Sequence, residues 1–382
     1  VLSAVLAAQK AGRRLIIPKA NAAEAALAKN EMVFSAASLI EVCSYLTDQT
    51  KLSLCTQNDF SIATSSSIDL ADVKGQAQAK RSLEIAAAGK HSMLLVGPPG
   101  TGKTMLASRL PTLLPPLSDE QALEVATVAS ANSCFNPEKW QQIPFRSPHH
   151  SASTAALVGG GRPPRPGEIS LAHHGVLFLD ELPEFSRQVL ESLREPLESG
   201  FITISRAAFQ TIFPAQFQLV AAMNPCPCGY AGDIYHECRC SSEYIQRYRA
   251  KLSGPLLDRI DMHLEVPAMP ADMLLTESIN EESSVTVRKR VDVARLLQLK
   301  RQDKPNAELN ARELNEVCHI NGEAKKILQN IMTKFRFSAR VYHRILKVAL
   351  TIADLKGSEI IRAEDISEAL LYRCLDKQKK LL

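Results

Sequence analysis

The fold is decided by residues 92–104, which read Ser92-Met93-Leu94-Leu95-Val96-Gly97-Pro98-Pro99-Gly100-Thr101-Gly102-Lys103-Thr104. The first five residues predict a buried strand, and residues 103–110 predict a helix. The residues from Gly97 to Thr104 fit the P-loop pattern between that strand and that helix. Such glycines let backbone N–H groups surround phosphates at a helix N-terminus. We therefore expect ATP here, with Lys103 on its β- and γ-phosphates and the Thr104 hydroxyl on Mg²⁺.

A second apolar strand, predicted over residues 176–179, delivers two acids, Asp180 and Glu181. Ligands of open α/β sheets gather at the carboxyl ends of the strands. We expect Asp180 to hold Mg²⁺ through water and Glu181 to polarise the attacking water. A third strand, 218–223, ends at Asn224. An Asn-Pro pair alone usually marks a turn. Because Asn224 ends a strand of the same sheet, we expect its side-chain amide to orient the attacking water.

The spacing of strands and helices predicts five regions. The alternation from 71 to 270 indicates a parallel sheet covered by helices, hence an α/β fold. Before it, residues 1–47 resemble an α/β fragment with helices near 1–12, 22–28 and 39–46 and a strand at 14–18, and the polar residues 48–70 resemble a linker. After it, residues 271–305 form a connector with a basic helix, and 306–382 keep helical periodicity.

Composition describes a globular chain, with 45% hydrophobic and 23% charged residues. No apolar run approaches the about 18 residues that a membrane helix needs. The net charge of +4 neither demands nor excludes nucleic acid. Cysteine usage favours a reducing compartment, so we expect a cytoplasmic protein. Because the chain starts at Val1 inside an amphipathic pattern, we also expect sequence to be missing before it.

Four of the nine cysteines lie within fifteen residues of one another, as Cys226-Pro227-Cys228 and Cys238-Arg239-Cys240. Four thiolates suit structural Zn²⁺, although the usual zinc spacing is C-x₂-C. An iron–sulfur cluster and a set of reduced, unligated cysteines remain alternatives. The loop between the pairs is polar, which favours a metal that holds it together.

The motifs resemble those of AAA+ ATPases of the helix-2-insert branch, and then those of Mg-chelatase-like proteins of the ComM/YifB type. The similarity covers essentially the whole chain and is carried by residues 145–181, by Asn224-Pro225-Cys226-Pro227-Cys228-Gly229 and by residues 253–261. It implies a P-loop AAA+ parallel sheet with a helix-2 insert, a pre-sensor hairpin and an all-α lid. Residues 1–47 would end a Lon-protease-like N-terminal domain.

The resemblance also implies a homohexamer with ATP between neighbouring subunits. Arg259 matches the arginine finger and Arg340 the lid arginine called sensor 2. Without the family, either arginine is more simply a surface cation.

ComM-type proteins are helicases that promote branch migration during natural transformation, and the resemblance implies that function, with DNA and recombination proteins as partners and no membrane. Two insertions are expected to contact DNA phosphates. One is a loop that contains Arg146, His149, His150, Arg162 and Arg165, and the other is the hairpin of 201–207 and 209–212, which contains Arg206. The two adjacent histidines are more often polar surface than metal ligands.

Several alternatives stay open at this point. A chelatase-type ATPase ring that remodels a partner protein is the second hypothesis, and a protein-remodelling ATPase without DNA affinity is the third. The basic segment 284–304 is either a DNA contact or an amphipathic helix with a solvated basic face, in which Val287, Val291, Ala294 and Leu297/Leu299 keep helical spacing. Tyr248, Arg249 and Lys251 are equally ambiguous.

Overall fold

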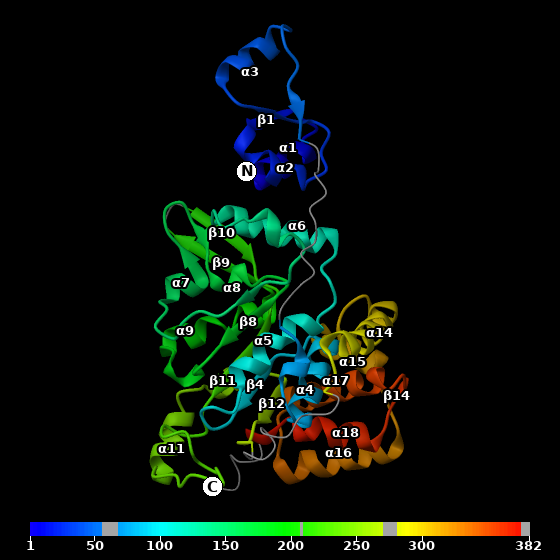
Figure 1. Cartoon of the computed structure of the whole chain (residues 1–382). Coiled ribbons are helices and arrows are strands. Elements are labelled where there is room, and N and C mark those ends of the chain that lie inside the picture. The colour runs from blue at the N-terminus through cyan, green and yellow to red at the C-terminus, as the bar shows by residue number, and fades with distance from the viewer. Residues whose placement is uncertain (56–67, 207–208, 270–280, 376–382) are drawn as a thin grey trace.

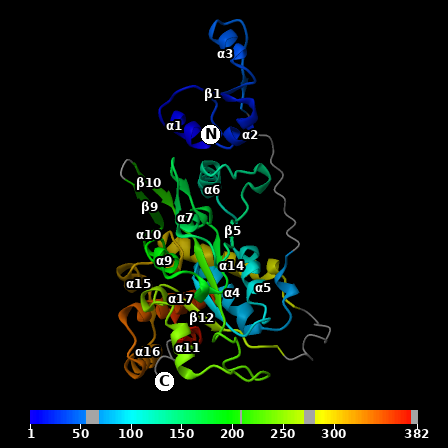
Figure 2. The same ribbon diagram turned by 90° about the vertical axis from the view of Figure 1, so that its left-hand side faces the viewer.

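The computed structural model describes residues 1–55, 68–206, 209–269 and 281–375 (Figure 1). The expected connector residues 271–280 and Ala207 lie outside these ranges. Figures 1 and 2 both show a small N-terminal unit above helix α6, a central α/β unit, and a C-terminal group of helices beside it. Within the described residues, every helix is too short or too polar to cross a bilayer.

A five-stranded parallel sheet forms the centre of the molecule, as the apolar runs predict. Its order is β12-β4-β11-β8-β5, and all its pairings are parallel. The strands are β4 (Met93–Val96), β5 (Phe145–Arg146), β8 (Val176–Leu179), β11 (Gln218–Met223) and β12 (Met262–Glu265). Strands β4, β8 and β11 are buried throughout, because helices cover both faces of the sheet.

One face of the sheet is covered by helices that come from both the early and the late part of the sequence. These elements are η2 (Leu70–Asp72), α4 (Ala77–Gly89), α5 (Lys103–Leu113) and α14 (Ser284–Gln302). Helix α14, predicted as a connector helix, packs on α4 and α5. Its buried face is Val287, Val291, Ala294 and Gln298, whereas Leu297 and Leu299 are exposed, so that part of the prediction is wrong. Gln298 takes the buried position at this end of the helix, where its Oε1 accepts a hydrogen bond from the backbone N–H of Asn306.

Insertions surround the sheet on its other sides. Strands β6 and β7 pair, as do β9 and β10, both antiparallel. The elements are α6 (Asp119–Ala131), η3 (Pro137–Lys139), α7 (Thr154–Val158), β6 (Gly159–Gly160), β7 (Arg165–Pro166), α8 (Glu168–Leu171), η4 (Leu182–Glu184), α9 (Arg187–Ser192), α10 (Pro196–Ser199), β9 (Phe201–Arg206), β10 (Phe209–Pro214), α11 (Ser242–Arg249) and α12 (Gly254–Leu257).

The C-terminal region is helical, as predicted, apart from one short parallel pair of strands. It consists of η5 (Asn306–Glu308), α15 (Ala311–Val317), β13 (His319–Ile320), α16 (Gly322–Phe335), α17 (Ala339–Leu355), β14 (Ile360–Ile361) and α18 (Ala363–Leu371). Helix α17 is buried from Ile345 to Asp354 and packs on α4, α14 and α18. The lid helices therefore share one hydrophobic core with the sheet.

The N-terminal unit extends further than predicted. It comprises α1 (Leu2–Lys10), β1 (Leu15–Pro18), η1 (Lys19–Asn21), α2 (Ala22–Ala26), β2 (Val33–Ala36), α3 (Leu39–Leu46) and β3 (Ser53–Leu54). Strand β3 pairs with β2 inside the range expected to be linker, so this sheet continues beyond residue 47. A Lon-like fold for the unit stays a prediction.

Candidate nucleotide site

The P-loop has the geometry that its sequence predicts. It joins β4 to α5, and Gly100 and Gly102 have φ angles of +78° and +81°, which favour glycine. A side-chain carbon on Gly97 would lie 2.2 Å from the carbonyl oxygen of Val266, so only glycine fits there. The loop leaves open space at Gly100, where nothing lies within 4 Å of an added Cβ. This backbone fits a phosphate cradle.

Lys103 points back into this loop from the first turn of α5. Its ammonium donates to the carbonyl oxygens of Gly97 (2.8 Å) and Pro98 (2.7 Å) and lies 3.3 Å from Asn224 Oδ1. Burial lowers the pKa of Lys103, and the carboxylates of Asp180 and Glu181 oppose that shift. The cation therefore lies between the Gly97-Pro98 backbone and Asn224, which follows β11.

The predicted magnesium ligands lie side by side. The Thr104 hydroxyl donates to Asp180 Oδ2 at 2.7 Å, across the boundary between α5 and the end of β8. Asn224 follows β11, the strand between β4 and β8, so all three motifs meet at the carboxyl edge of the sheet. A hydroxyl and a carboxylate are oxygen donors that Mg²⁺ prefers, and the residues fit this ion.

Glu181 has a partner that sequence reasoning did not find. His150 Nδ1 lies 3.1 Å from Glu181 Oε2, and Glu181 itself has a left-handed backbone with φ of +51°. The ring of His149 packs against that of His150 with centroids 4.1 Å apart, and His149 Nδ1 forms a hydrogen bond with Ser151 Oγ. The paired histidines therefore contact the expected catalytic carboxylate, and the only signal was their place in the loop after β5.

Arg259, the first of the two predicted arginines, lies away from this chain's own P-loop. Arg259 precedes β12 at the amino edge of the sheet, and the four residues of that strand separate the two edges by about 13 Å. Its guanidinium donates to the carbonyl oxygens of Arg194 (3.1 Å) and Pro255 (2.6 Å) and pairs with Glu198 (2.7 Å). Arg340 is exposed in the first turn of α17.

An ion cluster beside Arg259 joins the lid to the sheet. Asp261 is buried and contacts Arg344 of α17, and its Oδ2 lies 3.4 Å from His91 Nδ1. Burial by itself raises the pKa of Asp261, but Arg344 and His91 hold it well below the usual range. Sequence reasoning missed this cluster because its members are far apart in the chain.

A second histidine pair also lay outside the predicted site. Glu124 of α6 accepts from Nε2 of His173 (3.0 Å) and of His174 (2.7 Å), while the Gln216 N–H donates to His173 Nδ1 (3.1 Å). Neutral His173 thus uses both ring nitrogens and keeps no lone pair for a metal. Burial in the first place, and the neighbouring His174 in the second, lower the pKa of His173 to about 4.

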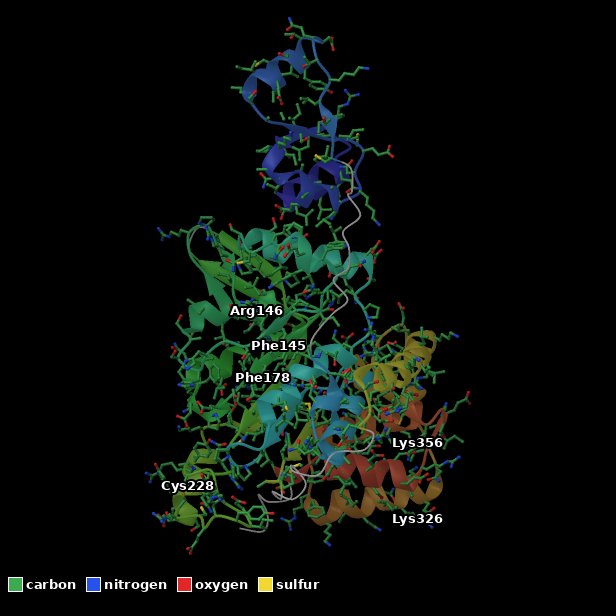
Figure 3. All side chains as sticks on the ribbon, viewed as in Figure 1. Phe145, Arg146, Phe178, Cys228, Lys326 and Lys356 are labelled. Atoms are coloured by element: carbon green, nitrogen blue, oxygen red, sulfur yellow. The ribbon has the colours of Figure 1, made fainter. Side chains whose placement is uncertain are left out.

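The expected DNA-contacting arginines differ in their surroundings. Arg146 makes a two-pronged ion pair with Glu168, at 2.6 and 2.7 Å. Figure 3 labels Arg146 next to Phe145, whose ring stacks on that of Phe178. Arg162 and Arg165 are exposed on the β6–β7 hairpin. Arg206 ends β9, and its side chain lies outside the described part of the structure.

The two insertions that carry these arginines touch each other. A Cβ on Gly159 of β6 would lie 3.0 Å from Ile204 Cδ1 of β9. The hairpin of β9 and β10 exposes Phe201 and Ile212. The structure thus brings the two predicted insertions together as one surface.

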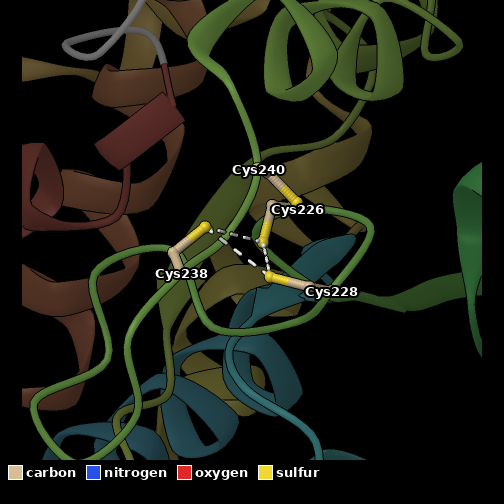
Figure 4. A group of neighbouring side chains, drawn as sticks. All are labelled: Cys226, Cys228, Cys238 and Cys240. Atoms are coloured by element: carbon tan, nitrogen blue, oxygen red, sulfur yellow. Dashed lines mark hydrogen bonds between the residues drawn. The ribbon is translucent and has the colours of Figure 1, made fainter.

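The four clustered cysteines do converge (Figure 4). All their sulfur atoms lie within 4.8 Å of one another, and the residues are free of disulfides. Cys226 and Cys228 lie shortly after Asn224 in the chain, so the cluster lies close to the candidate nucleotide site.

Comparisons with known proteins agree with this architecture. The model of the family "Magnesium chelatase, subunit ChlI" matches residues 69–274, and that of its C-terminal region matches 281–373. The chain is 50% identical over 380 residues to the competence protein ComM of Haemophilus influenzae, covering 98% of this chain and 74% of that protein. It is 49% identical over 377 residues to the YifB protein of Salmonella typhimurium, with the same coverage of 98% and 74%.

A more distant relative is the magnesium-chelatase 67 kDa subunit of Heliobacterium mobile, which is 26% identical over 260 residues, covering 60% of this chain and 38% of that subunit. The similarity to ComM and YifB is much greater and extends through the N-terminal unit and the cysteine cluster. Together with the P-loop, the acidic strand end and the helical C-terminal region, it shows that the chain belongs to the Mg-chelatase-like AAA+ family, as a protein of the ComM/YifB type.

Proposed function

We propose that this chain is an ATP hydrolase and one subunit of a homohexameric DNA motor that promotes branch migration in recombination during natural transformation. ATP hydrolysis is supported by one observation: the side chains of Lys103, Thr104, Asp180 and Asn224 lie together at one edge of the sheet. The relative whose name is competence protein ComM supports a role in natural transformation. A cytoplasmic location and recombination proteins as partners belong to the same proposal.

In this proposal each side chain has a defined task. Lys103 exchanges its carbonyl partners for phosphate oxygens, which are stronger acceptors for a cation. Thr104 and Asp180 hold Mg²⁺, which neutralises charge on the phosphates. Glu181 polarises the attacking water, and Asn224 orients it. The Gly97, Pro98, Pro99, Gly100, Thr101 and Gly102 backbone surrounds the phosphates.

The position of Arg259 supports the proposed ring. Arg259 lies at the amino edge of the sheet, so its own P-loop is out of reach, and a neighbouring subunit's P-loop is the proposed target. Reaching it requires release of Glu198. A finger of this kind contributes ~10³–10⁵ in rate. We assign Arg340 to the lid contact with nucleotide.

DNA contact is proposed for the joined insertions. Arg162 and Arg165 are exposed and free to meet phosphates, with Arg206 on the adjoining hairpin. Arg146 contributes less, because Glu168 already neutralises its charge. In α14, Arg290 and Arg301 pair with acids of the core, so that helix serves mainly to hold the fold together.

The test is ATP turnover with and without branched DNA at two salt concentrations. We expect stimulation that weakens as salt rises, because phosphate contacts release counterions. The double variant Arg162→Ala/Arg165→Ala is expected to need more DNA for the same stimulation. Arg312→Ala, which removes an exposed arginine of α15 that pairs with Glu316, is the control. Salt-independent turnover without DNA stimulation would overturn the motor.

The second candidate is an ATPase ring that remodels a partner protein, as a subunit of a chelatase-like complex. The family match and the Heliobacterium mobile relative favour it. It predicts turnover that is indifferent to DNA and is raised by a protein partner. The same assay therefore separates the two functions.

A further inference from the structure

The four cysteines have the spacing of ligands around one ion. Cys226 Sγ lies 3.3 Å from Cys228 Sγ and 3.7 Å from Cys238 Sγ, and the last two sulfurs are 3.6 Å apart. The sulfur of Cys240 lies within 4.8 Å of all three. Four thiolates at the Zn–S distance of about 2.3 Å from one tetrahedral centre stand about 3.8 Å apart. An iron–sulfur cluster spreads its cysteines over several irons, so the compact arrangement favours a single ion.

The loop of residues 226–240, which carries the two cysteine pairs and which we call the knuckle, has two features that favour a bound metal. The backbone N–H of Ala231 donates to Cys226 Sγ at 3.3 Å, a contact that favours a thiolate. Ile234 and Tyr235 of this loop are exposed, at 80% and 53%. With so little apolar surface buried, the loop needs another source of stability, and a structural metal supplies one.

This knuckle packs directly on the nucleotide site. Gly229 has a φ of +89°, and a Cβ on it would lie 2.8 Å from Pro99 Cδ and 3.9 Å from Asn224 Cγ. Arg249 of α11 donates to the carbonyl oxygen of Pro225, the residue after Asn224, at 3.1 Å. The loop residues 231–234 also line a pocket together with Gly97 and Pro98. The knuckle therefore contacts both the P-loop and the amide expected to orient water.

We propose that Cys226, Cys228, Cys238 and Cys240 hold one Zn²⁺, and that this metal clamps the knuckle against Pro99 and Asn224. Nucleotide binding then depends on the metal through these two contacts. The inference deepens the proposed function, since it assumes that ATP binds at Lys103.

The experiment measures metal content and nucleotide affinity on the whole chain, without DNA. Zinc is counted after release into a colorimetric chelator, and Co²⁺ replacement reports tetrahedral thiolate ligation by its visible absorption. The affinity for a fluorescent ATP analogue is measured in parallel. The test variant is Cys238→Ser/Cys240→Ser, which leaves the buried Cys226 in place. The matched control is Cys43→Ser/Cys134→Ser, which changes two exposed cysteines outside the knuckle.

We expect one Zn²⁺ per chain in the native protein and in the control. The double knuckle variant should lose the metal and bind the analogue about tenfold more weakly or worse. Absence of zinc from the native protein, iron in its place, or unchanged affinity in a metal-free variant would overturn the proposal.

Gly229→Ala keeps every cysteine and tests the clamp itself. Loss of affinity, with or without loss of zinc, supports the proposal, and unchanged affinity overturns it. Lys103→Ala tests the proposed nucleotide site separately from the zinc clamp. If this variant bound the ATP analogue normally, the nucleotide site at Lys103 would be refuted, and the clamp would not.

Discussion

Mixing two inactive variants tests the proposed placement of Arg259. Lys103→Ala removes the phosphate-binding cation, and Arg259→Ala removes the cation at the opposite edge of the sheet. Each variant alone is expected to lose turnover, Arg259→Ala by ~10³-fold or more. Neither subunit can repair its own site, because about 13 Å of strand separates the two residues within one chain.

In a mixed ring the two defects complement each other. An active junction needs a P-loop from the Arg259→Ala subunit and an arginine from the Lys103→Ala subunit. For equal amounts mixed at random, each requirement is met half the time, so about one quarter of the junctions become active. Turnover should therefore recover to about a quarter of the native rate if junctions act independently.

The assay is steady-state ATP turnover after the two variants are mixed, exchanged and reassembled. Each variant mixed with itself serves as the control, and chromatography confirms that the assembly state is unchanged. No recovery from rings that do contain both subunits would refute an arginine that acts across the junction. Activity of Arg259→Ala alone would refute its role altogether.

Three further predictions concern the same chain. Glu181→Gln should retain binding of an ATP analogue and lose hydrolysis, whereas normal turnover would remove the role assigned to Glu181. His150→Ala frees the Glu181 carboxylate from a 3.1 Å contact, so ATP turnover without DNA should rise a few-fold. The ratio of turnover without DNA to turnover with DNA should then approach one, and Arg312→Ala is the control. His173 has a folded-state pKa of about 4, lowered first by burial, so between pH 6.5 and 4 the unfolded chain binds a proton that the folded chain does not. Folding stability should therefore fall over that window, by at most about 3 kcal/mol at 1.36 kcal/mol per unit of pKa shift, and His173→Gln should flatten the dependence in urea melts at several pH values.

The parts of the site that the sequence predicted are those with local signals. The P-loop, the acids after β8 and Asn224 each follow an apolar strand, and the parallel order of the sheet brings the three together. Strand β5 has only two residues, so its apolar run was too short to recognise. The residues 297 and 299 of α14 kept helical spacing but point outward, since periodicity alone does not fix which side of a broad apolar face is buried.

What the sequence did not predict depends on contacts between distant segments. His150 meets Glu181, Arg146 pairs with Glu168, and Asp261 meets Arg344, over separations of 31, 22 and 83 residues. No composition or spacing rule links such positions. A charge that looks available in the sequence, such as Arg146, is neutralised only once the fold brings an acid to it.

The contact between the N-terminal unit and α6 has a consequence for how the protein can be divided. Leu2, Val5, Ala25 and Ala26 share one hydrophobic cluster with Leu117, Ala122, Ala126 and Trp140. Lys29 pairs with Asp119 at 2.8 Å, and Glu24 accepts from Ser130. The covalent connection between residues 55 and 68 is thus not what keeps the two parts together. A chain cut there at an engineered protease site should elute as one particle and separate only in denaturant. A fragment that starts at residue 68 should expose the apolar face of this cluster and tend to aggregate.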